Sequence, residues 1–425
     1  MSIHPLSPPD TPAPAEQTPS RSILDRVVGA LRARRGVSAA GAIVLLVTVA
    51  GVGLTAVNSS AEGTEALWHP PTGAVAQPTD EPAAPAADTV SLSATGDIIM
   101  GDAPGHLPPR NGKGYFDKIK ALLPADLVMG NLEQPITEET GSGKCPPKPS
   151  PNPAATPSPG ASPTPKNNCH QFRVPPSYAN HLKDAGFDLL NTANNHARDY
   201  GTAGFNNTQR ALEAAGLQHT GETNQITIAE VKGVKIAVLG FSSYSGNNSL
   251  INLTSAKKVV AKAAERADIV VVQVHMGAEG ADKSHVRPGT ETFLGENRGN
   301  PVAFSRAVID AGADLIIGHG PHVVRGLEFY KGRLIAYSLG NFAGGGQLSS
   351  GGRVGWGGVL HATLNPDGSF VSGRFHSTYF SGSYGIPQPD TKDRALGLLR
   401  QMTEEDFGAN GAVVSADGSI SAPAT

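Results

Sequence analysis

The chain has 425 residues, enough for one large domain or two ordinary ones with a sizeable core. It contains 34 lysines and arginines against 37 aspartates and glutamates, for a formal net charge of -3 at pH 7. The composition shows no excess of basic residues, which argues against nucleic acid as a partner.

The N-terminal part predicts a membrane anchor. No charged residue occurs in residues 37–57, and a helix of ~20 apolar residues spans a bilayer. Arg32, Arg34 and Arg35 precede this segment, so the positive-inside rule keeps residues 1–36 in the cytoplasm as a disordered tail. We therefore expect a single-pass plasma-membrane protein that contacts the lipid bilayer through 37–57 and has an extracellular C-terminal domain. A cleaved signal peptide is the alternative, and Arg34 with Arg35 also allows a twin-arginine export route.

The composition divides the remaining chain further. Residues 58–88 repeat Pro, Ala, Thr and Glu, which is typical of an extended linker. The ordered domain is expected over 89–386, followed by a C-terminal tail over 387–425 with one helix. A Pro-rich insertion lies between Cys145 and Cys169. In an oxidising exterior these cysteines would close the insertion with a disulfide; two independent free thiols are the alternative.

Within the domain, apolar strand-like runs alternate with helical patterns. The predicted strands are 89–95, 126–130, 187–193, 226–231, 235–241, 268–274, 313–318, 327–330, 333–339, 357–364 and 369–375. The predicted helices are 115–123, 177–186, 203–216, 302–312 and 394–407. Lys232-Gly233 and Lys331-Gly332 indicate hairpin turns between neighbouring strands. This alternation predicts an α/β fold with mixed sheets covered by helices.

Polar residues follow five of the predicted strands at the point where each strand ends. They are Asp97; Asn131 and Glu133; Asn194, Asn195 and His196; His275 and Glu279; and His319 and His322. Ligands of such sheets gather at the carboxyl ends of the strands, so we expect these side chains to converge. Imidazole, carboxylate and amide oxygen together suit divalent ions such as Mn, Zn or Fe. Two such ions would activate a water and clamp a phosphoryl group.

Single residues of this set also have structural explanations. Asp97 could cap the segment after its strand, and the asparagines of the third strand end could be turn residues. His275 could be a core histidine with satisfied hydrogen bonds. His319 and His322 have no comparable packing reason, because two imidazoles three positions apart stand in a Gly/Pro loop.

A resemblance to a known family is carried by the segments ATGDIIMGD, GNLEQPIT, NNHARDYG, HMGAEG and GHGPHVVRGLEFYKGRLIAYSLGNF. Over roughly residues 91–380 the chain resembles the CapA family of poly-γ-glutamate capsule synthesis proteins, which is similar in fold to calcineurin-like metallophosphoesterases. The resemblance implies a four-layer α/β/β/α sandwich of mixed sheets and a bacterial cell-envelope location. It also implies work alongside the membrane subunits of the poly-γ-glutamate synthase.

The same resemblance implies a role for each strand-end residue. Asp97 would be a first metal ligand, and Glu133 or Asn131 would take the place of a bridging carboxylate. Asn195 would ligate a second ion. His196 would be the general acid that protonates the leaving oxygen, so His196 and Glu133 are the expected catalytic residues. The metal shell would be completed by His275, His319 and His322.

The motifs depart from the phosphoesterase pattern at three positions. Ile99 stands where those enzymes have the histidine of Asp-x-His, and Asn131 stands where their second motif has aspartate. Gly320 replaces a histidine that many relatives show. These departures argue against a two-metal hydrolase and leave a single-ion site.

The favoured hypothesis is a membrane-anchored envelope protein of the poly-γ-glutamate capsule synthesis type. It would bind or process an anionic polymer at a divalent-metal site. One alternative is a metal-dependent phosphoesterase or other hydrolase acting on cell-envelope substrates. The other is a non-catalytic scaffold on the same fold.

Overall fold

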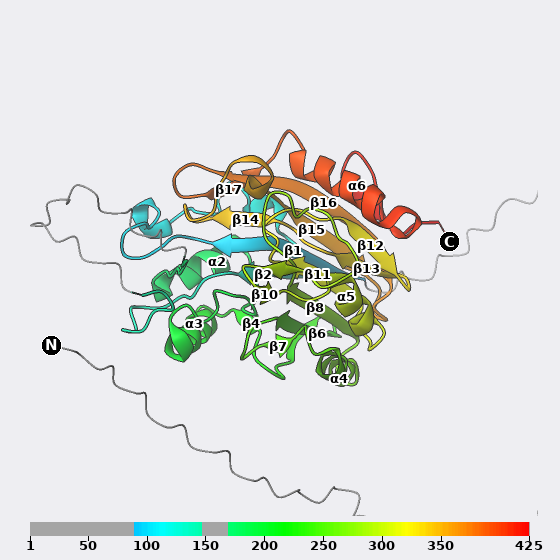
Figure 1. The fold of residues 1–425 in the computed structure, drawn as a ribbon, viewed down its shortest axis with the longest axis horizontal. Coiled ribbons are helices and arrows are strands. Elements are labelled where there is room, and N and C mark those ends of the chain that lie inside the picture. The colour runs from blue at the N-terminus through cyan, green and yellow to red at the C-terminus, as the bar shows by residue number, and fades with distance from the viewer. Residues whose placement is uncertain (1–88, 147–168, 425) are drawn as a thin grey trace, which may run out of the picture. The chain divides into compact units, whose positions relative to one another are not determined.

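Two β-sheets form the centre of the computed structural model, which describes residues 89–146 and 169–424. The chain divides into two units, Met1–Pro78 and Thr79–Thr425, and all described residues belong to the second. Within those residues one sheet has ten strands and the other has seven (Figure 1). The prediction of an α/β fold with mixed sheets is confirmed.

The ten-stranded sheet is organised around its long first strand. Its main path is β18 (Val413–Val414), β19 (Ser419–Ser421), β16 (Phe370–Ser381), β15 (Trp356–Leu364), β1 (Val90–Ile99), β2 (Leu127–Leu132), β3 (Leu189–Asn191) and β4 (Gln218–Thr220). Off this path, β14 (Asn341–Gly344) pairs with β1, and β17 (Ile386–Pro389) pairs with β16. The run from β1 to β4 is parallel, whereas β15 lies antiparallel to β1.

The seven-stranded sheet has a parallel centre with a hairpin at each edge. Its path is β12 (Leu327–Tyr330), β13 (Arg333–Ala336), β11 (Leu315–His319), β8 (Ile269–His275), β6 (Val234–Ser242) and β5 (Thr227–Val231), and β7 (Asn248–Ser249) pairs with β6. The two predicted hairpin turns are present. Lys232 and Lys331 each have a φ of 51°, and the glycine that follows each also has a positive φ. These are the dihedrals that tight hairpin turns demand. A separate small hairpin is formed by β9 (Thr292–Phe293) and β10 (Glu296–Asn297).

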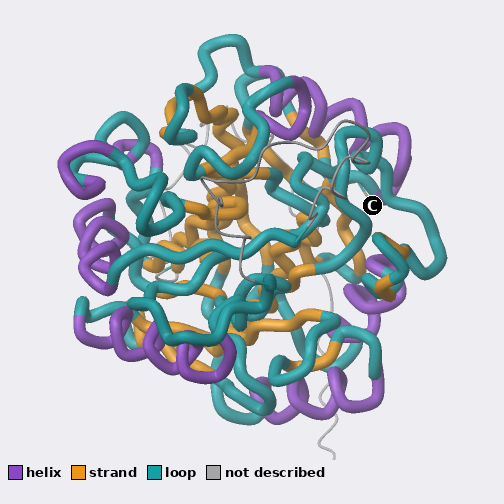
Figure 2. Tube along the Cα trace, turned by 60° about the vertical axis from the view of Figure 1, so that its left-hand side comes forward, coloured by secondary structure: helices purple, strands orange, loops and turns teal. Residues whose placement is uncertain are grey.

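The sheets pack face to face, and helices cover their outer faces. Leu92 and Met129 of the first sheet share one buried cluster with Val271 and Ile317 of the second. Successive side chains of a strand point to opposite faces, so Val270 packs on the other side with the helices. The first sheet is covered by α2 (Ala179–Ala185) and α3 (Gly201–Ala214), and the second by α4 (Leu253–Ala264) and α5 (Pro301–Ile309). Figure 2 shows the helices surrounding the strands.

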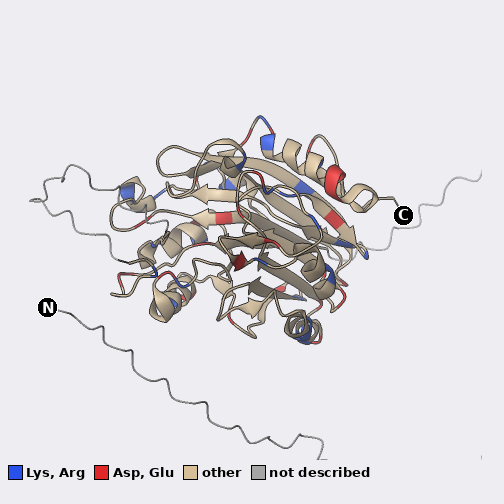
Figure 3. Cartoon of the chain, in the orientation of Figure 1, with Lys and Arg blue, Asp and Glu red and all other residues tan. Residues whose placement is uncertain are grey.

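The charged residues fit this layering. Figure 3 shows that basic and acidic residues intermingle along the helices and loops, whereas most of each strand is uncharged. The arrangement agrees with the near-neutral net charge. The buried polar residues at the strand ends, such as Asp97, Glu133 and His275, depart from this pattern and call for a chemical explanation.

The C-terminal segment is part of the fold, which corrects the predicted tail over 387–425. The helix α6 (Arg394–Phe407) contacts β12, β15 and β16. Its apolar stripe joins the cluster between the sheets through Ala395, Leu396, Leu398, Leu399 and Met402. Beyond it, β19 pairs with β16, so backbone hydrogen bonds also tie this end of the chain to the first sheet.

Two helix predictions need correction. Residues 115–123, expected to be a helix, form turns and a 3₁₀ helix over Lys120–Leu122. Gly112 and Gly114 have positive φ values just before this segment, and Pro124 ends it, so a regular helix has little room. The helix α4 was not predicted. Further 3₁₀ helices cover Pro109–Gly112, Pro176–Tyr178, Gly352–Gly355 and Gly408–Asn410.

The predicted plasma-membrane location is contradicted. Among the helices of 89–146 and 169–424, none is long and apolar enough to cross a membrane. The longest helices, α3 and α6, have 14 residues each, fewer than the ~20 that a bilayer requires. The predicted tail 1–36, anchor 37–57 and linker 58–88 lie outside the described residues.

Candidate functional site

The carboxyl ends of the parallel strands bring the polar residues together. In the first sheet, Asp97 of β1 lies opposite Asn131 of β2, which lies opposite Asn191 of β3. In the second sheet, His275 of β8 lies opposite His319 of β11. Because parallel strands end at the same edge, each sheet presents one row of polar side chains there.

A change of strand partner places Asp97 at this edge. Residues Val90 to Thr95 of β1 pair with β15, and from Asp97 onwards β1 pairs with β14. Gly96 lies at the change, where a Cβ atom would stand only 1.9 Å from the carbonyl oxygen of Gly340. That carbonyl accepts a hydrogen bond from the backbone N–H of Asp97 at 3.0 Å. The glycine therefore permits the close approach that orients the aspartate.

Asp97, Glu133 and His275 form a group that could hold a divalent metal ion. All three are buried, and one ligand atom from each lies within 4.8 Å of the others. Neither carboxylate oxygen of Glu133 and neither ring nitrogen of His275 has a hydrogen-bond partner in the described part of the chain. Buried polar atoms are normally paired, so four unpaired donors and acceptors in one place fit the coordination of an ion.

Two further histidines lie against this group. His322 Nδ1 is 3.2 Å from Asp97 Oδ2 and 2.8 Å from Asn341 Oδ1, and its Nε2 is 3.6 Å from Glu133 Oε1. His319 Nε2 lies 3.2 Å from Gln273 Oε1, which leaves Nδ1 directed at Asp97 Oδ1, 3.6 Å away.

The proton affinities in the cluster are strongly shifted. Burial and the neighbouring Asp97 raise the pKa of Glu133 well above its usual value. Burial opposes the charge of His322, but Glu133 and Asp97 together raise its pKa well above 6.5. Burial would also raise the pKa of Asp97, yet its contact with His322 lowers that pKa to about 2. Burial lowers the pKa of His275 well below 6.5 and that of His319 to about 4. Glu133 and His322 thus bind protons that a metal ion would displace.

Asn131 takes part as a support for Asp97. Its Nδ2 donates to Asp97 Oδ1 at 2.8 Å. Its Oδ1 accepts hydrogen bonds from Asn191 at 2.9 Å and Asn194 at 3.1 Å. Since both ends of the Asn131 amide are engaged, the structure does not offer its oxygen to an ion.

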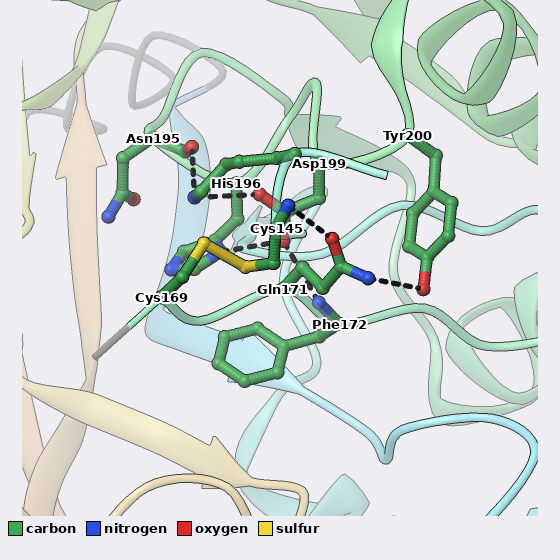
Figure 4. The surroundings of a disulfide bond; sticks show 9 residues. Cys145, Cys169, Gln171, Phe172, Asn195, His196, Asp199 and Tyr200 are labelled. Carbon is green, nitrogen blue, oxygen red and sulfur yellow. Dashed lines mark hydrogen bonds and ion pairs between the residues drawn. A yellow bond between two sulfur atoms is a disulfide. The ribbon is translucent and has the colours of Figure 1, made fainter. Parts of the chain in front are cut away.

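His196 lies beside the cluster and is held by an aspartate. Its Nδ1 is 2.8 Å from Asp199 Oδ2, which also accepts a hydrogen bond from the backbone N–H of Phe172 at 2.9 Å (Figure 4). Asp199 Oδ1 pairs with Lys144 Nζ at 2.9 Å. Burial lowers the pKa of His196, and the charge of Asp199 opposes that effect. With Nδ1 directed at the carboxylate, Nε2 is the nitrogen left for a ligand.

A disulfide joins Cys145 and Cys169 next to this pair (Figure 4). Two residues close to the cysteines in the sequence reach the site. Lys144 pairs with Asp199, and the ring of Phe172 lies 4.6 Å from that of His196. The disulfide therefore ties together the two segments that hold His196 in place.

A cavity of about 460 Å³ opens over the cluster. His322 belongs to both the cluster and the cavity wall. Asn195, whose Oδ1 has no hydrogen-bond partner among the residues described, and His196 also line it. Lys144, Glu279 and Arg298 add charged groups to the wall.

The strand-end rule thus located most of the cluster, but several supporting residues escaped it. The missed residues are Lys144, Asn191, Asp199, Gln273, Arg298 and Asn341. Asp199 stands three positions after His196 and so carried a usable signal, whereas Asn191 lay inside the predicted strand 187–193 and only the shorter observed strand β3 ends at it. Arg298 lies in a loop with no pattern in the sequence that points to the site.

Comparisons with known proteins agree with the predicted family. The family model described as "Bacterial capsule synthesis protein PGA_cap" matches residues 91–345. The "PGA biosynthesis protein CapA" of Bacillus subtilis (strain 168) is 29% identical over 352 residues, which are 75% of this chain and 79% of the relative. The "Capsule biosynthesis protein CapA" of Bacillus anthracis is 31% identical over 278 residues, and the match spans 60% of each chain.

Among solved structures, the 5'-nucleotidase precursor from Thermus thermophilus is 12% identical. The match covers 75% of this chain and 59% of the nucleotidase chain, with a TM-score of 0.35. A likeness this distant carries no argument about the site. The match to the family model is stronger evidence, because it spans more than half of the chain and contains every residue of the cluster. The chain belongs to the bacterial capsule synthesis protein family, PGA_cap.

Proposed function

We propose that this protein takes part in poly-γ-glutamate assembly by binding the anionic polymer in the cavity, at a divalent metal ion held by the buried cluster. The observation that carries the proposal is the set of unpaired buried atoms of Glu133 and His275 beneath that cavity. The relatives' names refer to biosynthesis of this polymer and its capsule, which supports the choice of ligand. We further propose that the protein works with the enzyme that polymerises glutamate.

The proposed metal ligands are Asp97, Glu133 and His275, completed by His319, His322 and Asn195. Mixed imidazole and carboxylate donors suit Mn, Zn or Fe. Such an ion, when bound, supplies a positive charge that polarises a carbonyl or phosphoryl oxygen. Asn131 is proposed to orient Asp97, since its amide already has three hydrogen bonds.

In this proposal His196 contacts the ligand from the cavity wall. Asp199 fixes its ring by the contact at Nδ1, so Nε2 is available to accept a hydrogen bond or a proton. To act as a general acid, His196 must first gain a proton at Nε2. Burial opposes that gain and the Asp199 carboxylate favours it.

Equilibrium binding of γ-linked polyglutamate to the purified full chain tests the proposal. We expect binding with Mn²⁺ or Zn²⁺, loss after chelation, and loss in the Glu133→Gln variant. The matched control is Glu213→Gln, because Glu213 is an exposed residue of α3 that pairs with His219. An α-linked polyglutamate of equal length controls for charge and should bind more weakly. Failure of the metal-loaded wild type to bind the γ-linked polymer would contradict the proposal.

A second candidate function is metal-dependent phosphoester hydrolysis. The pairing of His196 with Asp199 beside the cluster favours it, because a positioned histidine suits proton transfer to a leaving oxygen. Turnover of generic phosphodiesters with added Mn²⁺ should then fall in His196→Ala. If the wild type turns over no phosphodiester while still binding the polymer, the fold serves as a binding scaffold.

A further inference from the structure

Arg298 lies on the cavity wall and is held from several sides. Its side chain is buried. Nη2 lies 2.8 Å from Glu279 Oε1, and Nε donates a hydrogen bond to Glu296 Oε2 at 3.0 Å. The guanidinium carbon is 5.5 Å from the ring centre of Tyr244 and 5.3 Å from that of Phe293. The side chain is therefore fixed before any ligand arrives.

One nitrogen of this guanidinium has no hydrogen-bond partner in the part of the chain that the structure describes. Nη1 makes no hydrogen bond to any residue in 89–146 or 169–424, although it is shielded from solvent. The backbone cannot readily turn it elsewhere, because Arg298 N donates to Glu291 O and Arg298 O accepts from Gly277 N, both at 2.9 Å. A guanidinium presents its donors in a rigid fork, so the unpaired one keeps a defined direction.

Arg298 also stands close to the proposed metal ligands. Glu279 links them: its Oε1 pairs with Arg298, and its Oε2 lies 3.7 Å from His322 Nε2. His322 Nε2 is in turn 3.6 Å from Glu133 Oε1. A group bound at the cluster and extending along the cavity wall would therefore pass Arg298.

We infer that Arg298 is a specificity-determining residue that anchors an oxyanion of the ligand, a carboxylate or a phosphate, beside the metal cluster. The inference rests on the proposed function and deepens it. In a γ-linked glutamate chain the anchored group would be the α-carboxylate of one unit. The methylene groups of that unit would lie against Phe293 and Leu294, which line the same cavity. Leu294 is 83% exposed at the tip of the β9–β10 hairpin, and such contact would cover it.

The flanking carboxylates decide what kind of contribution Arg298 makes. Glu279 and Glu296 together carry more negative charge than the guanidinium carries positive charge, so Arg298 supplies a directed hydrogen-bond donor more than net attraction. A lysine would keep the charge and lose the fork, because an ammonium is a point charge without fixed donor geometry. Arg298→Lys should therefore restore only part of the binding that Arg298→Gln loses.

The test measures binding of two probes to the full chain loaded with Mn²⁺: a short γ-linked glutamate oligomer and inorganic phosphate. Wild type is compared with Arg298→Gln, Arg298→Lys and the control Arg374→Gln. Arg374 is an exposed arginine paired with Asp417 away from the cavity. We expect Arg298→Gln to weaken binding of each probe that wild type binds by roughly 10- to 100-fold, as for a lost charge-assisted hydrogen bond. Mn²⁺ affinity should stay unchanged, and Arg374→Gln should match wild type.

Each other outcome has a distinct meaning. Wild-type affinity in Arg298→Gln overturns the inference, and so does a parallel loss of Mn²⁺ binding, which would make Arg298 a structural residue of the cluster. If wild type binds phosphate but not the oligomer, the proposed function fails, and Arg298 is judged on phosphate alone. If wild type binds neither probe, both proposals are overturned.

Discussion

At the scale of single residues, the site depends on side chains whose polar atoms lack partners inside the described part of the protein. The side chains of Glu133 and His275 are buried and make no hydrogen bond to any described residue, whereas the neighbouring side chains of Asp97 and His322 contact each other. Burying unpaired polar groups costs free energy, and a bound ion is a ligand that would satisfy these atoms.

The shifted pKa values predict how metal affinity depends on pH. The folded protein binds protons at Glu133 and His322 more tightly than free side chains do, because both pKa values are raised. A metal ion must displace these protons, so affinity should fall as pH falls and keep rising above pH 6.5. Each released proton contributes up to ~10-fold per pH unit. Mn²⁺ titration calorimetry over that range measures the slope, and a flat profile would rule out competition with protons.

Gly96→Ala should destabilise the fold locally. The added Cβ would collide with the carbonyl oxygen of Gly340, and that backbone group cannot move without losing its bond to Asp97. We expect a loss of about 1–3 kcal/mol in the free energy of unfolding, as for overpacked sites. Urea denaturation measures it. Gly105→Ala is the control, since nothing lies within 4 Å of its Cβ position; equal stability of the two variants would refute the steric argument.

At the scale of elements, the disulfide segment and the loop after β3 act together. Lys144 directly precedes Cys145, and Phe172 lies three positions after Cys169. Both contact Asp199, which holds His196. The covalent link thus fixes a side chain of the cavity wall at a distance from the sulfur atoms themselves.

Replacing both cysteines by serine should therefore affect stability and His196 together. The cysteines are 24 positions apart, so loop closure predicts a loss of about 3 kcal/mol. The pKa of His196 should also rise, because burial and the Lys144 charge both lower it in the native fold. Urea denaturation and an NMR titration of the histidines check the two effects. An unchanged His196 pKa would show that the disulfide does not position it.

Elements also show what the sequence could and could not predict. Hydrophobic runs located eleven of the strands but missed the short ones β4, β7, β9, β10, β14, β17, β18 and β19. The rule that parallel strands end at one edge located Asp97, Glu133 and His275. The rule could not reveal that Asn131 supports Asp97, because its partners Asn191 and Asn194 come from another strand end. The sequence could not identify Arg298 as a site residue, because only tertiary packing brings its loop to the cavity.

At the scale of the whole molecule, the cluster joins the two sheets. Asp97 lies in β1 of the first sheet, and Glu133 directly follows β2. In the second sheet, His275 and His319 are the last residues of β8 and β11, and His322 lies in the loop after β11. An ion bound among these side chains would therefore be held by residues of both sheets.

Metal binding should accordingly raise the thermal stability of the described domain. An ion that binds only the native state stabilises it by about 2.7 kcal/mol at a concentration 100 times its dissociation constant. Differential scanning calorimetry with and without Mn²⁺ should show a higher Tm for the wild type and no shift for His275→Ala. A similar shift in both proteins would place the ion elsewhere.

The metal content of the purified full chain tests the central claim most directly. We expect the wild type, after exposure to Mn²⁺ or Zn²⁺ and removal of free ion, to retain a divalent ion by elemental analysis. His275→Ala should retain little, while His219→Ala, which changes a largely buried histidine of β4 that pairs with the exposed Glu213, should retain as much as wild type. A wild-type protein that holds no ion, or a His275→Ala variant that holds the same amount, would contradict the account.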